Sequence, residues 1–424
     1  MKKLILILLC VSSVSLSFTQ TLSPAKPEEA GMSGERLARI DKVVNDYITK
    51  KWIPGAAVLI ARNGKIVFHK AYGVNDDAKQ TALRKDDIFR IASQTQAITS
   101  AAIMILYEER KLLLDDPVSK YIAEFKNPKV LVSFNDKDSS YTSEPAKSEI
   151  TIRHLLTHTS GLDYPVIGSK ELVAIYAKAK IPSGIGTPDH NLGDKIKALG
   201  KLPLKHKPGD RFTYGLSMDV LGYVVEVISG MNLNDFLKKR IFEPLGMNDT
   251  YFYLPKEKQS RLTTLYEEKA GKVTKVVAMK DRDPDYPDLP GVYYSGGAGL
   301  SSTVEDYARF LQMLMNGGLY NGNRILDGKT IELMLTNQLK GNSGTFQFGL
   351  GFGLEATKND KLSAVSIGSF SWGGILSTSY WVDPKEKIVA LIFKQIYPTT
   401  HGDLDEKFIA LVYQAIADGG NDKR

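Results

Sequence analysis

The amino-acid sequence predicts an α/β protein in which both ends of the chain build one sheet and a mainly helical lobe is inserted between them. Strand-like stretches lie near the N-terminus, around an Asn-Gly pair at residues 63–64, and again after residue 345. In the middle of the chain, helical segments alternate with polar loops. We therefore expect residues 21–114 and 289–424 to form an α/β lobe and residues 115–288 a mainly helical lobe.

The first 20 residues have the pattern of a secretory signal peptide. Two lysines precede an apolar run at residues 4–9, and a serine-rich segment suits cleavage near residues 18–20. We expect a periplasmic or secreted protein. Cys10 is the only cysteine, so the mature chain should contain no disulfide, thiolate nucleophile or cysteine metal site.

Composition excludes several classes of function. The chain is 43% hydrophobic and 24% charged, with a formal net charge of +7, and its basic residues are scattered singly, so no nucleic-acid partner is expected. No second apolar run reaches the roughly 18 residues of a membrane span, and no phosphate loop or dinucleotide fingerprint is present, so no cofactor is expected. Four aspartates within residues 281–288 lack the glycine and glutamate of an EF-hand loop. We expect a solvated acidic loop there and no metal.

The elements before the middle of the chain follow from simple periodicities. Ser33 can cap a helix that runs to residue 50 with its apolar residues on one face. Two strands, at residues 57–61 and 66–70, flank the Asn-Gly pair. The next helix is apolar or small on every side over residues 97–106, which is typical of a buried helix.

Later elements are marked by glycines and by strand patterns. One helix over residues 217–228 should end at Gly230, and another over residues 235–242 should end before Pro244. A glycine-dense corner at residues 295–300 precedes a helix with a possible capping box. The remaining predicted elements are that helix at 303–316, strands at 346–355, 362–368, 377–382 and 387–394, and a closing helix at 403–417.

A serine lies where the buried helix begins. Ser93 belongs to the segment Phe-Arg-Ile-Ala-Ser-Gln-Thr-Gln at residues 89–96. A serine at this end of a helix meets backbone N–H groups without intrahelical partners, at the positive end of the helix dipole. That environment can stabilise an oxyanion, but it is equally the environment of an ordinary N-cap.

The segment resembles the nucleophile motif of the serine β-lactamase and penicillin-binding-protein superfamily, in which Ser-x-x-Lys opens a buried helix. Here Gln96 stands where that family has lysine. A serine hydroxyl needs an adjacent base, and glutamine, although one helical turn away on the same face, cannot accept a proton. The Ser-x-x-Lys at residues 23–26 contains a proline and precedes no apolar helix, so we interpret it as a chance match.

Tyr214 follows a Pro-Gly-Asp turn and resembles the second motif of the superfamily, Tyr-x-Asn, in which the tyrosine moves the proton of the nucleophile. Leu216 replaces the asparagine, as it does in β-lactamase-like carboxylesterases. Because that asparagine would hydrogen-bond a substrate amide, its absence implies a site that is less specific for amides. The alternative is a tyrosine whose ring packs and whose hydroxyl is merely satisfied.

The segment Trp372-Gly373-Gly374 resembles the third motif, a Lys-Thr-Gly strand. In the family the next residue supplies an N–H that forms the oxyanion hole together with the N–H of the nucleophile, which implies Ile375 and Ser93 here. Trp372 in place of lysine removes the cation that pairs with the carboxylate of a β-lactam or a peptide. The alternative is a pair of glycines that only ease a bend in the strand.

The resemblance extends over residues 31–417 and implies a β-lactamase-like fold, with an antiparallel sheet flanked by helices, an inserted mainly helical lobe and a catalytic cleft between the two lobes. It also implies an acyl-enzyme mechanism on a small-molecule ester or amide. Leu216 and Trp372 favour an esterase over a β-lactamase or a D-alanyl-D-alanine carboxypeptidase.

Three interpretations of Gln96 stay open: a weakened hydrolase, an incidental variant of an active one, or an inactive protein that binds an acyl or peptidoglycan-like ligand. His158 is expected to be structural, since no carboxylate is placed to complete a Ser-His-Asp relay. The sequence does not indicate an oligomeric state.

Overall fold

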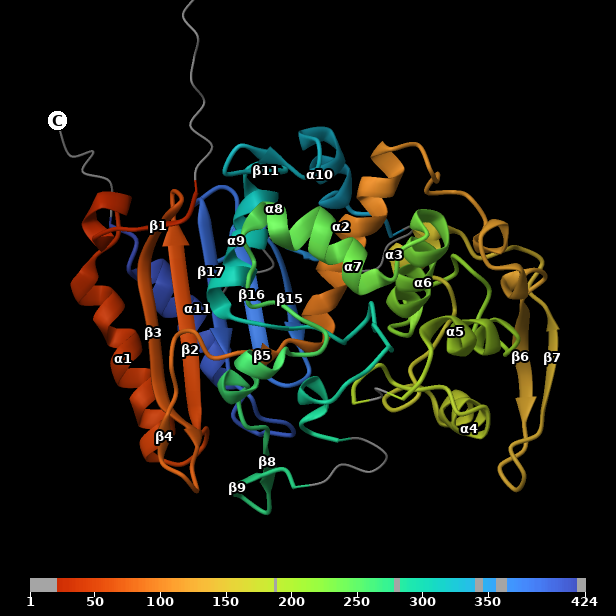
Figure 1. The fold of residues 1–424 in the computed structure, drawn as a ribbon, viewed down its shortest axis with the longest axis horizontal. Coiled ribbons are helices and arrows are strands. Elements are labelled where there is room, and N and C mark those ends of the chain that lie inside the picture. The colour runs from red at the N-terminus through yellow and green to blue at the C-terminus, as the bar shows by residue number, and fades with distance from the viewer. Residues whose placement is uncertain (1–20, 187–188, 278–282, 340–345, 356–363, 418–424) are drawn as a thin grey trace, which may run out of the picture.

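The computed structural model describes residues 21–186, 189–277, 283–339, 346–355 and 364–417 (Figure 1). The predicted signal peptide lies outside these residues. Within them, no helix combines the length and the apolar character that a membrane crossing requires.

A nine-stranded sheet forms the centre of the described chain, in the order β1-β3-β2-β17-β16-β15-β14-β13, with β4 added to β3. The two ends of the chain meet where β17 pairs antiparallel with β2, with Leu391 opposite Leu59. Only β1 pairs in parallel, so the predicted antiparallel sheet is mixed at one edge. The strands are β1 (Ser23–Pro24), β2 (Gly55–Arg62), β3 (Lys65–Asp76), β4 (Thr81–Ala82), β13 (Gln347–Phe348), β14 (Gly353–Leu354), β15 (Phe370–Gly374), β16 (Thr378–Asp383) and β17 (Ile388–Phe393).

Helices cover both faces of this sheet. Along β2, alternate residues point to opposite faces: Leu59 packs into the larger hydrophobic cluster, and Val58 and Ile60 pack into the smaller one. The helices α1 (Gly34–Thr49) and α11 (Asp403–Gln414) lie on the side of the smaller cluster, whereas α2 (Thr95–Glu108) and α9 (Val304–Met315) lie on the other (Figure 1). The predicted α/β fold is confirmed.

Several predicted elements are confirmed by their caps and turns. The Oγ of Ser33 accepts a hydrogen bond of 3.2 Å from the N–H of Arg36 and so caps α1. Asn63 and Gly64 have φ angles of 54° and 74°, which is the left-handed pair that a tight hairpin turn between β2 and β3 requires. Helix α6 (Ser217–Ser229) ends at Gly230, whose φ is 71°.

Three predicted elements differ from the structure. The single strand expected at residues 346–355 is a hairpin of β13 and β14, in which Phe348 lies opposite Gly353. The helix expected to end before Pro244 runs on through α7 (Leu233–Leu237), a π-helical stretch (Lys238–Phe242) and α8 (Glu243–Leu245). The wider π turn changes the hydrogen-bond register ahead of the proline, which cannot donate. The strand expected at residues 362–368 lies partly outside the described residues. Its described part forms a turn, in which the N–H of Ser369 donates to the Ser366 carbonyl at 3.1 Å.

The middle of the chain lies beside the sheet (Figure 1). It contains two hairpins that the sequence did not predict. One of them contacts the segment that follows β17, where the N–H of Tyr266 donates to the Gln395 carbonyl at 2.9 Å. The lobe boundaries at residues 115 and 288 stay predictions. The helices and strands of this part besides α6, α7 and α8 are β6 (Lys129–Phe134), β7 (Tyr141–Pro145), α3 (Ile152–Leu156), α4 (Lys170–Lys178), α5 (Leu192–Gly200), β8 (Tyr266–Lys269) and β9 (Lys272–Lys275). Other short elements are β5 (Phe89–Arg90), β10 (Ser301–Ser302), β11 (Leu319–Tyr320), β12 (Asn323–Arg324) and α10 (Gly328–Met334).

Candidate active site

Ser93 lies in a single 3₁₀ turn, Ala92–Gln94, between β5 and α2. Ala92 is buried and has a φ of 42°, a left-handed conformation that is costly for a residue with a Cβ. Helix α2 begins at Thr95, and no side chain caps its first turn. The N-cap alternative for Ser93 is therefore wrong, and its hydroxyl is available to the cleft.

The glycine corner lets α2 and α6 approach each other closely. The backbone at Gly296 passes between the two helices, where an added Cβ would lie 2.5 Å from the Met218 carbonyl oxygen. The hydroxyl of Thr99 donates to the Gly296 carbonyl at 2.8 Å. Because the corner fits so tightly, the neighbouring Gly297 carbonyl is carried to the first turn of α2, beside Gln96.

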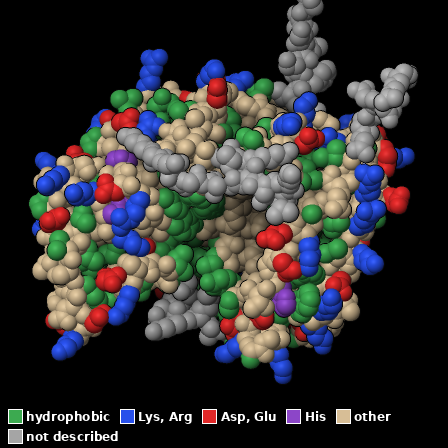
Figure 2. Space-filling view, turned by 180° about the vertical axis from the view of Figure 1, so that it is seen from behind, with side chains coloured by type: hydrophobic (Ala, Val, Ile, Leu, Met, Phe, Trp, Pro, Cys, Tyr) green, Lys and Arg blue, Asp and Glu red, His purple; other side chains and the backbone are tan. Residues whose placement is uncertain are grey.

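Ser93 opens into a cavity of about 620 Å³. None of the described residues that line it carries a charge. Four apolar side chains at its rim are 41% to 53% exposed, namely Val166, Ile167, Phe346 and Tyr397. The rest of the lining is Ser93, Tyr164, Ser183, Ile185, Phe212, Tyr214, Trp372, Gly373, Ile375 and Leu376. The space-filling view shows a hollow with hydrophobic side chains along its wall (Figure 2).

The hydroxyl of Tyr214 is the meeting point of three predicted site residues. The Nε2 of Gln96 donates a short hydrogen bond to Tyr214 Oη, the Trp372 ring centroid lies 5.9 Å from that of Tyr214, and Ser93 lines the same cavity. Burial raises the pKa of Tyr214; the polar groups of Ser93, Trp372 and Gln96 counteract the increase, and the charge of Asp219 adds to it.

The carboxamide of Gln96 has a single consistent orientation. Its nitrogen lies 3.2 Å from the Gly297 carbonyl oxygen, which can only accept, so this end must be the N–H₂. Its oxygen lies 3.0 Å from the Nε2 of His158, which must then donate. Gln96 is 1% exposed, and its amide is used at both ends.

His158 touches Gln96 and is enclosed by aromatic rings. Its ring centroid lies 4.7 Å from that of Tyr214, 5.6 Å from Phe212 and 5.8 Å from Phe348. Burial lowers the pKa of His158 to about 3, so the imidazole is neutral at physiological pH. With its Nε2 proton directed at Gln96, it is not a base for Ser93.

Sequence reasoning missed Asp219, which lies beneath the site in α6. It is fully buried, and the hydroxyl of Ser295 donates to its Oδ1 at 2.6 Å. Burial raises the pKa of Asp219 to about 7. One signal could have found it, because it is the only acidic residue within the first nine residues of an otherwise apolar helix.

The third motif is brought to the nucleophile by a glycine. On β15, an added Cβ at Gly374 would lie 2.3 Å from the Ile91 carbonyl oxygen, so only glycine lets this strand pass the segment that leads to Ser93. Trp372, Gly373 and Ile375 consequently line the same cavity as Ser93. The catalytic and oxyanion roles of these residues stay predictions.

Leu216 does not reach the cavity. It is the N-cap residue of α6, is 1% exposed and packs into the larger hydrophobic cluster. The predicted contact of this position with a substrate therefore has no counterpart among the described lining residues. A leucine at this position is favoured by burial in the core.

The acidic loop after residue 282 is not simply solvated. Asp285 forms an ion pair of 2.9 Å with the fully buried guanidinium of Arg90, so it supports the segment that leads into Ser93. The position of Asp281 lies outside the described residues. Within those described, no group of three or more His, Cys, Asp or Glu side chains could hold a metal ion.

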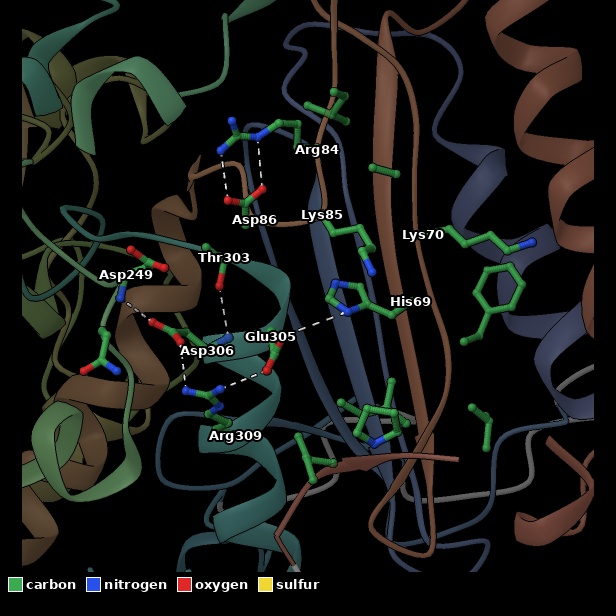
Figure 3. Close-up of a pocket in the computed structure, with 18 residues that line it drawn as sticks. His69, Lys70, Arg84, Lys85, Asp86, Asp249, Thr303, Glu305, Asp306 and Arg309 are labelled. Carbon is green, nitrogen blue, oxygen red and sulfur yellow. Dashed lines mark hydrogen bonds and ion pairs between the residues drawn. The ribbon is translucent and has the colours of Figure 1, made fainter. Parts of the chain in front are cut away.

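A larger cavity, of about 1020 Å³, lies between β3 and the start of α9 (Figure 3). Its charges neutralise one another. Arg309 pairs with Glu305 at 2.8 Å, and Arg84 pairs with Asp86 at 2.9 Å. Glu305 also lies 3.9 Å from the Nδ1 of His69. No predicted site residue lines this cavity, so the cavity at Ser93 is the candidate active site.

Comparison with known proteins finds relatives along nearly the whole chain. The family model described as Beta-lactamase matches residues 40–414. Esterase EstB of Burkholderia gladioli is 30% identical over 365 residues, covering 82% of this chain and 87% of EstB. Lovastatin esterase of Penicillium rubens is 27% identical over 378 residues, covering 83% of this chain and 91% of that protein. The solved structure of EstCE1, a hydrolase with promiscuous acyltransferase activity, matches with a TM-score of 0.76 at 26% identity and covers 89% of this chain and 99% of its own.

Proposed function

Because the chain belongs to the beta-lactamase family, we propose that it is a serine esterase that cleaves uncharged, hydrophobic esters through an acyl-Ser93 intermediate. The observation that carries this proposal is that Ser93 and Tyr214 line the same cavity, none of whose described lining residues is charged. Relatives named as esterases support the same reaction class.

The proposed reaction uses three groups of the chain. The Oγ of Ser93 attacks the ester carbonyl and transfers its proton to ionised Tyr214 Oη. The developing oxyanion accepts hydrogen bonds from the N–H groups of Ser93 and Ile375. Tyr214 then protonates the leaving alcohol, and a water molecule attacks the acyl group by the same route in reverse.

Gln96 makes this enzyme slow at neutral pH. The phenolate of Tyr214 would accept hydrogen bonds from Gln96, Trp372 and Ser93, all of which are neutral. Hydrogen bonds from a charged donor are roughly twice as strong as those from a neutral one. A lysine would therefore stabilise the phenolate more than Gln96 does, and the rate should rise with pH as Tyr214 ionises.

The lining favours an ester over a β-lactam or a peptide. A carboxylate on the substrate would find no cation among the described residues of the cavity, because Trp372 occupies the place of the family's lysine. The apolar rim at Val166, Ile167 and Phe346 suits a hydrophobic acyl or alcohol group.

A second candidate is a binding protein without turnover, and the orientation of Gln96 favours it. The amide is hydrogen-bonded at both ends, so this residue is a fitted part of the site and not an unfilled space.

In both cases we propose export from the cytoplasm, on the strength of the signal-peptide pattern at residues 1–20. N-terminal sequencing of the protein recovered from cell fractions tests that export.

The function is tested by hydrolysis of p-nitrophenyl butyrate and of nitrocefin, with Ser93→Ala as the matched control. We expect faster turnover of the ester, and loss of that turnover in the control. Nitrocefin turnover that equals or exceeds ester turnover would contradict the esterase. Reaction with neither substrate, together with no mass labelling of Ser93 by a fluorophosphonate, would favour the binding protein.

A further inference from the structure

His158 lies directly behind Gln96 and outside the lining of the Ser93 cavity. We propose that His158 is a positioning residue whose neutral imidazole holds residue 96 against Tyr214. It does so in the tautomer whose Nε2 complements the group at residue 96, as donor to an amide oxygen or as acceptor from an N–H. The structural part of this inference stands without turnover, and only its kinetic consequence rests on the proposed function.

The direction of each hydrogen bond follows from Gly297. Its carbonyl oxygen lies 3.2 Å from the nitrogen of Gln96 and cannot donate, so the amide oxygen must face His158. Two acceptors cannot share a hydrogen bond, so the Nε2 of His158 carries the proton. Reversing the amide would place its oxygen against the Gly297 carbonyl oxygen and its N–H₂ against the Nε2–H of His158, so neither contact would be a hydrogen bond.

The imidazole of His158 is held in place by its surroundings, so its hydrogen bond can fix the orientation of the Gln96 amide. It is 0% exposed, and three aromatic rings surround it. Its backbone has a left-handed φ of 52°, and its carbonyl accepts a hydrogen bond of 2.7 Å from the N–H of Thr213. His158 therefore contacts both the residue that hydrogen-bonds Tyr214 and the backbone that precedes Tyr214.

The same imidazole can serve a lysine at position 96 with the other tautomer. An ammonium has three N–H donors and no acceptor, and the acceptors in reach of residue 96 are Tyr214 Oη and the Gly297 carbonyl. We expect the third N–H to point at the Nε2 of His158, which contacts the amide of Gln96 in this structure, so that Nε2 becomes an acceptor. Its proton must then move to Nδ1, which has no hydrogen-bond partner among the described residues.

The tautomer can be read directly by ¹⁵N NMR, using two-bond correlations between ring nitrogens and carbon-bound protons. The chain has 6 histidines, so the signals of His158 are assigned by their loss in His158→Gln. We expect the Nε2–H form in wild type and the Nδ1–H form in Gln96→Lys. An Nδ1–H form in wild type, or one tautomer in both proteins, would overturn the proposal.

A second measurement covers the case in which Gln96→Lys does not fold. The ionisation of 3,5-difluorotyrosine at position 214 is followed by ¹⁹F NMR in His158→Phe and in His158→Gln. Phenylalanine keeps a ring but has no donor, whereas the glutamine N–H₂ can occupy the place of Nε2. We expect the pKa at position 214 to rise by about one unit in His158→Phe, equivalent to a tenfold change in ionisation, and to return towards wild type in His158→Gln.

Kinetics separate positioning from general damage. At a pH below that pKa, kcat/KM for the ester should fall about tenfold in His158→Phe with KM nearly unchanged, and His158→Gln should recover most of it. The remote His69→Phe, on β3, is the control for loss of a half-buried histidine. Equal pKa values in His158→Phe and wild type would refute the positioning role. A shifted pKa in a protein without turnover would refute only the proposed esterase.

Discussion

Replacing Gln96 with lysine supplies the group of the family's Ser-x-x-Lys motif that this chain lacks. The side chain of Gln96 already reaches Tyr214 Oη and the Gly297 carbonyl, and His158 can provide the third acceptor. An ammonium at this point would lie beside Tyr214, which lines the same cavity as Ser93. Gln96→Lys therefore supplies a charged donor that would stabilise the Tyr214 phenolate, the proposed base for Ser93.

The size of the gain follows from two opposing effects. General-base catalysis contributes about 10²–10⁴-fold, so kcat/KM should rise on that scale. Against this, residue 96 is 1% exposed, and burial penalises the charged form of an introduced lysine and so lowers its pKa. A lysine with a lowered pKa in the folded state destabilises the protein below its unfolded pKa of about 10.4. The melting temperature of the variant should thus fall below that of wild type at pH 7 and approach it near pH 10.

The assay compares ester hydrolysis by wild type, Gln96→Lys and Gln96→Met between pH 6 and pH 10. Methionine keeps a similar length but offers neither charge nor N–H donor, so it should be slower than wild type. Free amines also cleave activated esters, so the double variant Ser93→Ala/Gln96→Lys is the control for direct attack by the introduced lysine. We expect the double variant to lose the gain. A folded Gln96→Lys protein that is no faster than wild type would show that the site lacks more than its lysine, and would favour the binding protein.

Three further changes test other parts of the site. Tyr214→Phe should lower kcat/KM for the ester by about 10²-fold, and an unchanged value would remove Tyr214 from the mechanism. Asp219→Asn removes a buried charge near Tyr214, so the pH–rate profile should move to lower pH. Because burial raises the pKa of Asp219 to about 7, the wild type should lose stability as pH rises from about 4 to about 7, and the melting temperature of Asp219→Asn should not show that loss. Gly374→Ala places a Cβ 2.3 Å from the Ile91 carbonyl oxygen, so it should lower the free energy of unfolding by roughly 1–3 kcal/mol and remove most activity. Gly373→Ala is the milder control, because its added Cβ would have its nearest atom at 3.2 Å. Equal effects of the two substitutions would contradict the reasoning.

The sequence by itself determined the elements whose signals are local. The serine cap of α1, the Asn-Gly turn between β2 and β3, and Gly230 after α6 each act within a few residues, so their patterns could be recognised without a structure. Ser93, Tyr214 and Trp372, which the three motifs singled out, line one cavity, and their catalytic roles stay predictions. The π-helical stretch before Pro244 was not predicted, because a local rule treats proline as a stop.

Only the tertiary structure decided what Gln96 contacts. Its partners Gly297 and His158 are 201 and 62 residues away in the chain, and no spacing rule connects positions so distant. The same holds for Asp285, whose ion pair with Arg90 joins residues 195 apart. Leu216 was misplaced for a related reason, since the direction of a side chain at the start of a helix depends on which neighbours bury it. Periodicity records the preference of each residue for a face, whereas hydrogen bonds between distant segments exist only after the sheet and helices have packed.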